Sequence, residues 1–201
     1  MSKRLYVAYG SNLNIQQMAS RCPGAKLYGT GVIENFELQF KGQPHGAFAT
    51  IAPKDGASVP VAVWEISKRN EQALDRYEGY PSHYFKQDVP VQLDGKEVTA
   101  MVYVMNLKMD FGLPAPYYYD VVREGYEDCG LDPAALEQAL RESTAQFYGS
   151  HWPHQESIFR FESDAEPDED ELEEDDDPDL DEDEPDLDET DPFYFSEGMH
   201  L

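Results

Sequence analysis

Leu5-Tyr6-Val7-Ala8-Tyr9-Gly10-Ser11-Asn12-Leu13 is the stretch that decides the fold of this 201-residue chain. Leu5 to Tyr9 is a short run of β-favouring residues, and it closes on Gly10-Ser11-Asn12, a group typical of tight turns. Asn14 is suited to cap a short helix, which Pro23-Gly24 should end. The sequence therefore predicts a strand, a tight turn and a helix, in this order.

Further strands and helices are expected downstream of this unit. Segments rich in β-branched and aromatic residues, separated by turn formers, predict strands at 26–40, 47–52, 59–66, 84–93 and 98–105. Asp94-Gly95 predicts a hairpin turn between the last two. Helices are expected from an N-cap at Ser67 to Gly79, over 117–129 with a cap at Gly130, and from Asp132-Pro133 to about 148. Six or seven strands with interspersed helices predict one α+β domain over residues 1–161.

The acidic residues of the chain are concentrated near its C-terminal end. Residues 164–191 contain twenty Asp or Glu and no Lys or Arg, whereas the rest of the chain has twenty-one acidic and fifteen basic residues. Because such a composition cannot bury enough apolar surface to offset chain entropy, residues 162–201 are predicted to be a disordered acidic tail. Its last nine residues are richer in aromatic side chains and are either unstructured or a short docking peptide.

Cysteine content and hydropathy predict a cytoplasmic protein. The two cysteines, Cys22 and Cys129, are too few for a disulfide framework, and they lack the spacing of a zinc site. The N-terminal apolar run of about five residues is too short for a signal peptide, and no run approaches the roughly 20 residues of a membrane helix. We therefore expect a soluble protein that does not contact membranes.

The first candidate site is the turn Tyr9-Gly10-Ser11-Asn12. Backbone N–H groups where a helix begins, together with the Ser11 and Asn12 side chains, suit an anion or the negative charge that develops on a carbonyl oxygen. Taken alone, however, Gly-Ser-Asn is also ordinary turn chemistry.

The second candidate site is Glu78, within Asp75-Arg76-Tyr77-Glu78-Gly79-Tyr80-Pro81-Ser82-His83-Tyr84. Tyrosines on both sides of the carboxylate could exclude water and raise its pKa into the range of a general base. The alternatives are a solvated glutamate at a helix end and tyrosine rings that belong to the core.

Taken together, these motifs resemble the γ-glutamylcyclotransferase-like superfamily. Its members pair a Tyr-Gly-Ser-Asn-Leu stretch with an Asp-x-x-Glu-Gly segment, which stand here as residues 9–13 and 75–79. A third similar stretch, residues 113–119, precedes Gly125-Tyr126 and Gly130-Leu131. The resemblance covers residues from about 4 to 150. It implies a mixed, mostly antiparallel β-barrel with flanking helices.

The resemblance also implies an activity and a set of site residues. It implies a lyase or acyltransferase that needs no cofactor and no metal and that forms 5-oxoproline from a small or peptide-linked γ-glutamyl substrate. Glu78 would be the catalytic base and acid. The substrate-binding residues would be Tyr9, Gly10, Ser11, Asn12, Leu13, Tyr84 and Tyr118, although the run Tyr117-Tyr118-Tyr119 leaves the last position open by one. The leaving amine cannot be read from the sequence. Arg4 or Lys86 could hold a second carboxylate or be ordinary surface charges.

A different class of function also has to be weighed. The domain could be a catalytically idle scaffold whose acidic tail mimics nucleic acid or binds a basic partner. Binding to nucleic acid itself is disfavoured, because the chain lacks a basic surface. Metal hydrolysis is disfavoured as well. Among the histidines at 45, 83, 151, 154 and 200, only 151 and 154 are closely spaced, and Trp152-Pro153 between them argues against a shared helical face.

Overall fold

A computed structural model describes residues 3–151 of the chain. Its strands and helices follow one another in the order β1 (Lys3–Ala8), η1 (Ser11–Leu13, a 3₁₀ turn), α1 (Ile15–Arg21), β2 (Lys26–Gln43), β3 (Gly46–Ser67), α2 (Lys68–Tyr77), β4 (Tyr84–Leu93), β5 (Lys96–Met105), α3 (Pro116–Asp128) and α4 (Ala134–His151). The boundary proposed at residue 161, the tail at 162–201 and its aromatic end lie outside the described residues.

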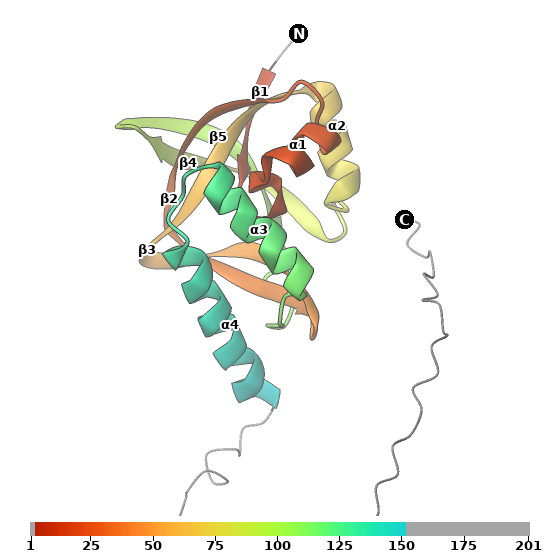
Figure 1. Cartoon of the computed structure of the whole chain (residues 1–201), viewed down its shortest axis with the longest axis vertical. Helices are drawn as coiled ribbons and strands as arrows, with labels where there is room; N and C mark the ends of the chain where they lie inside the picture. The colour runs from red at the N-terminus through yellow and green to blue at the C-terminus, as the bar shows by residue number, and fades with distance from the viewer. Residues whose placement is uncertain (1–2, 152–201) are drawn as a thin grey trace, which may run out of the picture. The chain divides into compact units, whose positions relative to one another are not determined.

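The five strands of this region form one closed barrel in the order β1-β3-β2-β4-β5 (Figure 1). Four of the pairings are antiparallel, and β1 lies parallel to β5, with Tyr6 opposite Met101 and Val7 opposite Val102. Alternate side chains of the strands fill the interior, among them the fully buried Val7, Ile33 and Ile51. The prediction of a mixed, mostly antiparallel barrel with flanking helices is confirmed.

The predicted number of strands was wrong by one or two. The segments expected at 47–52 and 59–66 are parts of the single 22-residue strand β3, which pairs with β2 on both sides of an interruption at residues 54–57. A register shift at Asn35, where φ is +60°, bends the pair at this point, and the Asn35 side chain accepts a hydrogen bond from the Gly56 N–H at 3.0 Å. The turn-forming residues therefore bend the long hairpin and do not end its strands.

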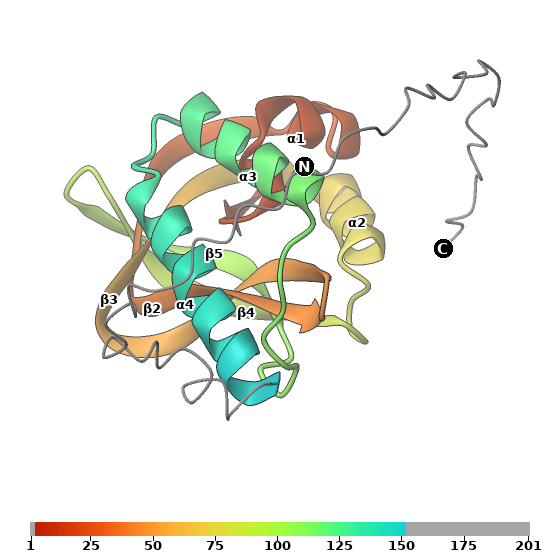
Figure 2. The ribbon, with the colours of Figure 1, turned by 60° about the horizontal axis from the view of Figure 1, so that its bottom comes forward.

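The helices cover the barrel from two sides (Figure 2). α4 packs against β2, α3 packs against η1, and α1 contacts α2. The close approach of α3 requires Gly125, since a Cβ there would lie 2.5 Å from the backbone nitrogen of Asn14. α3 therefore holds the turn after β1 against the mouth of the barrel.

Most predicted helix ends and turns are confirmed. Asn14 caps α1, Ser67 caps α2, and the Asp132 side chain accepts from the N–H of Ala134 at the start of α4. Asp94 and Gly95 form the hairpin turn with positive φ angles. None of the helices in residues 3–151 combines the length and the apolar content that crossing a membrane requires.

Candidate active site

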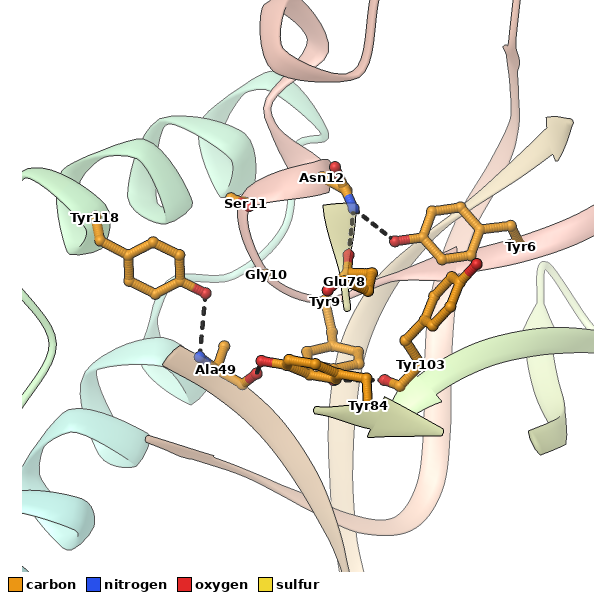
Figure 3. A pocket seen from close by; sticks show the side chains of 10 residues that line it. All are labelled: Tyr6, Tyr9, Gly10, Ser11, Asn12, Ala49, Glu78, Tyr84, Tyr103 and Tyr118. Atoms are coloured by element: carbon orange, nitrogen blue, oxygen red, sulfur yellow. Dashed lines mark hydrogen bonds between the residues drawn. The ribbon is translucent and has the colours of Figure 1, made fainter. Parts of the chain in front are cut away.

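A pocket opens where the turn after β1 meets the end of α2 (Figure 3). Its empty volume is about 320 Å³, including the open mouth. The residues that line it come from seven elements or their ends: Tyr6, Tyr9, Gly10, Ser11, Asn12, Ala49, Glu78, Tyr84, Tyr103 and Tyr118. Glu78 is the one ionisable carboxylate among them.

Local sequence directs Glu78 towards this pocket. Ser67 and Asn70 form a capping box that starts α2, and the helix ends with Glu78 as its C-cap. Gly79 follows with φ +63°, and a Cβ there would come within 2.6 Å of His83 Nδ1. Because only glycine adopts this left-handed turn in this space without strain, the chain reverses here and leaves the Glu78 side chain on the pocket side.

The Glu78 carboxylate is bound to Asn12. Asn12 Nδ2 donates to Glu78 Oε1 at 3.0 Å and to the Tyr6 hydroxyl at 2.8 Å. Burial raises the pKa of Glu78 to about 7, although the nearby Arg21 charge and the Asn12 hydrogen bond both favour the ionised form. A carboxyl group with this pKa can accept and return a proton near neutral pH.

The aromatic groups that surround Glu78 are not its neighbours in the sequence, apart from Tyr84. Tyr77 and Tyr80 are 49% and 43% exposed and do not line the pocket. The pocket rings belong to Tyr6, Tyr9, Tyr84, Tyr103 and Tyr118. They come from β1 and its end, from β4 and β5, and from α3, because the closed barrel gathers strand ends that are far apart in the chain.

Two of these tyrosines hold the backbone of Ala49 in β3. The Ala49 N–H donates to the Tyr118 hydroxyl at 3.1 Å, and the Tyr84 hydroxyl donates to the Ala49 carbonyl at 3.2 Å. Burial raises the pKa of both phenols above its usual range, so both stay neutral at ordinary pH. This wall of the pocket therefore offers hydroxyl groups without charge.

The structure brings seven of the eight candidate residues to this pocket. The exception is Leu13, whose side chain is fully buried in the core, where its carbonyl accepts from Cys129 Sγ. The open position in the tyrosine run is resolved by packing. Tyr117 is 76% exposed and Tyr119 packs against Phe40, whereas Tyr118 lines the pocket.

Sequence reasoning missed Arg21, Tyr6 and Tyr103. Tyr6 could have been found, since it lies in the short strand that leads directly into the turn. Arg21 ends α1, and nothing in its local sequence shows that the helix folds back to place its guanidinium on Ser11 and Asn12. Tyr103 lies in an apolar run whose only local signal was strand formation.

The two basic residues considered for a second carboxylate are engaged elsewhere. Arg4 forms salt bridges with Glu71 and Asp88, and Lys86 forms them with Glu71 and Asp75. Within residues 3–151, no three His, Cys, Asp or Glu side chains are grouped so that they could hold a metal ion.

The closed barrel thus carries one small pocket in which a single carboxyl group is surrounded by tyrosines. Residues 6–120 match the family described as gamma-glutamyl cyclotransferase, AIG2-like, and the chain belongs to this family. It is therefore an enzyme of the γ-glutamylcyclotransferase type, as the sequence motifs predicted.

Individual relatives agree with this assignment. The chain is 34% identical over 140 residues to a gamma-glutamylcyclotransferase from Bos taurus, an alignment that covers 63% of this chain and 72% of the bovine protein. It is 32% identical over 146 residues to a gamma-glutamylcyclotransferase from Homo sapiens, covering 68% and 77% of the two chains. A solved structure of a gamma-glutamyl cyclotransferase is similar with a TM-score of 0.63 and 32% identity, over 70% of this chain and 87% of the other.

Proposed function

We propose that the enzyme converts a γ-glutamyl amide into 5-oxoproline and a free amine, with Glu78 acting first as base and then as acid. The observation that carries this proposal is the position of the Glu78 carboxyl group in the pocket, bound to Asn12, with its pKa raised to about 7. The cyclotransferase names of the relatives support the reaction class.

The reaction needs few groups because its two partners belong to one molecule. Glu78 takes a proton from the α-ammonium group of the substrate, and the resulting amine attacks the γ-carbonyl carbon to close a five-membered ring. Collapse of the tetrahedral intermediate breaks the bond to the leaving nitrogen, which receives the proton from Glu78. The ring nitrogen then gives its second proton to the regenerated Glu78 carboxylate, which passes it to the released amine, so that 5-oxoproline and an ammonium product leave and Glu78 is ionised again. Holding the amine and the carbonyl in contact supplies most of the rate enhancement through orientation.

The turn after β1 is suited to the negative charge of the intermediate. In the proposal, backbone N–H groups of Gly10 to Asn12 donate to the oxygen of the former γ-carbonyl. The neutral phenols of Tyr84 and Tyr118 form the facing wall, where they add no charge that would compete with the oxyanion. The natural leaving amine is to be found with a panel of γ-glutamyl amino acids, γ-glutamyl-ε-lysine and simple γ-glutamyl amines.

The decisive test is Glu78→Gln, because an amide of the same shape cannot accept the proton. We expect 5-oxoproline release from every active member of the panel to fall by about 10²- to 10⁴-fold. Glu137→Gln, a change of the same kind at an exposed position of α4, is the matched control and should keep full activity. Wild-type turnover by Glu78→Gln would show that Glu78 is not the base.

The same variant gives a readout that does not depend on activity. A carboxyl group with a raised pKa in the folded state binds protons more tightly there than in the unfolded chain, so its ionisation destabilises the fold as the pH rises from about 4.5 to 7. Glu78→Gln removes this cost. Its free energy of unfolding should therefore exceed that of the wild type at pH 8 and converge with it at pH 4.5, as measured by denaturant titration.

A further inference from the structure

Arg21, the last residue of α1, contacts the turn of the pocket from behind. Its Nη1 donates to Asn12 Oδ1 at 2.7 Å and to Ser11 Oγ at 3.0 Å, and its Nη2 donates to Gln17. The guanidinium carbon lies 3.8 Å from the centre of the Tyr77 ring. A side chain held by three hydrogen bonds and a stacked ring has little freedom to move.

The contact with Asn12 decides which way its carboxamide points. An asparagine side chain has an accepting oxygen at one end and a donating nitrogen at the other, whereas a guanidinium group can only donate. With Oδ1 bound to Arg21, Nδ2 must face Tyr6 and Glu78, as observed. The flipped amide would set donors against Arg21 and an oxygen against the Glu78 carboxylate.

The other two partners of Asn12 cannot make this choice throughout the reaction. The Tyr6 hydroxyl both donates and accepts, so it fits either end of the amide. Glu78 requires a donor when it is ionised, but as a protonated acid it can itself donate. The Arg21 guanidinium group has no acceptor and therefore requires the oxygen in both steps.

We propose that Arg21 is a positioning residue of the reaction, which keeps Asn12 Nδ2 directed at Glu78 through both the base step and the acid step. This inference rests on the proposed function of Glu78. It gives Arg21 a role beyond packing, since the positive charge behind Asn12 also favours the carboxylate over the acid. The nearby Arg21 charge does lower the pKa of Glu78 against the larger effect of burial.

The pH profile separates this role from a structural one. Arg21→Met keeps the length of the side chain but removes its charge and donors. Its kcat/KM should be about tenfold below wild type at pH 6 and about threefold below at pH 8.5, because fewer Glu78 carboxyls are ionised at the lower pH. Arg21→Lys keeps the charge, so the acidic limb of its profile should coincide with that of the wild type. Arg141→Met, on the exposed side of α4, is the control and should change neither limb nor rate.

A ratio of wild-type to Arg21→Met kcat/KM that stays constant with pH would overturn the proposal. So would an acidic limb of the Arg21→Lys profile that is displaced as far as that of Arg21→Met. A second measurement needs no turnover: titration of the Glu78 carboxyl carbon by ¹³C NMR, with Glu78→Gln used for assignment. The midpoint should rise in Arg21→Met and stay near wild type in Arg21→Lys. An unchanged midpoint in Arg21→Met would overturn the role of Arg21 even if Glu78 is the base, whereas an active Glu78→Gln would instead refute the proposed function.

Discussion

Asp75 and Glu78 lie three residues apart at the end of the same helix, yet they occupy opposite electrostatic environments. Asp75 Oδ1 lies 2.6 Å from Lys86 Nζ and accepts from the Tyr103 hydroxyl at 2.6 Å. Glu78 is bound instead to the neutral amide of Asn12. One carboxylate is thus held by a cation, while the other lies in the pocket with a pKa of about 7.

This difference shows how one short segment can supply both an anchor and a titrating group. Lys86 also pairs with Glu71, and Glu71 pairs with Arg4 of β1, so salt bridges join α2 to the barrel. Tyr103 connects the two environments, because its ring lines the pocket while its hydroxyl binds Asp75. The ion-paired carboxylate fixes the helix end, and the carboxylate without a direct cation partner is left to exchange protons.

Asn12→Asp should have the largest effect, because it places a charge beside Glu78 where the wild type has a neutral amide. The new carboxylate keeps the contact with Arg21 but turns its second oxygen towards Glu78 in place of a donor, so two like charges share one site and the pKa of the pair rises. We expect kcat/KM at pH 7 to fall about a hundredfold. Asn12→Ala removes the donor without adding charge and should lose only about tenfold. Equal losses in the two variants, measured as 5-oxoproline release, would contradict the electrostatic account.

Much of the fold follows from the sequence because its signals are local. The caps at Asn14, Ser67 and Asp132 and the Asp94-Gly95 turn depend on residues within a few positions of one another, and all are confirmed. The merging of two expected strands into β3 could not be foreseen in this way. It depends on pairing with β2 and on the bend at Asn35, which is set by contacts across the hairpin.

The residues of the candidate site also fall into two groups, those with a local sequence signal and those that only the fold brings together. Glu78 and the turn at residues 9–12 were found because their motifs are contiguous, and Gly79 marks the helix end in the sequence. Two of the five tyrosines that line the pocket, Tyr6 and Tyr103, were missed, since closure of the barrel and not sequence proximity brings them to Glu78. Arg21 was missed for the same reason, because its partners depend on how α1 packs against the turn.

Asp75→Asn tests whether the ion pair of Asp75 with Lys86 anchors the end of α2. The amide oxygen can still accept from Tyr103, and Lys86 keeps Glu71, so the loss is confined to one partly exposed ion pair. We expect the free energy of unfolding to fall by about 1 kcal/mol and kcat/KM by about threefold, with the acidic limb unchanged. Denaturant titration and a pH profile measure the two effects. A displaced limb in this variant would mean that the charge of Asp75 acts on Glu78.

Removal of residues 162–201 should have the smallest effect. It tests whether the barrel alone sets the difference between the environments of Asp75 and Glu78. The deleted part carries the twenty acidic residues of 164–191, and the field of a charge in water at physiological salt is largely screened beyond about 8 Å. The truncated chain should keep kcat/KM within about twofold at 0.15 M salt. A several-fold rise in activity at pH 6 that disappears in 1 M salt would show that the acidic residues contribute to the field at Glu78. Loss of binding to a basic protein, with no turnover in either chain, would instead favour the idle scaffold.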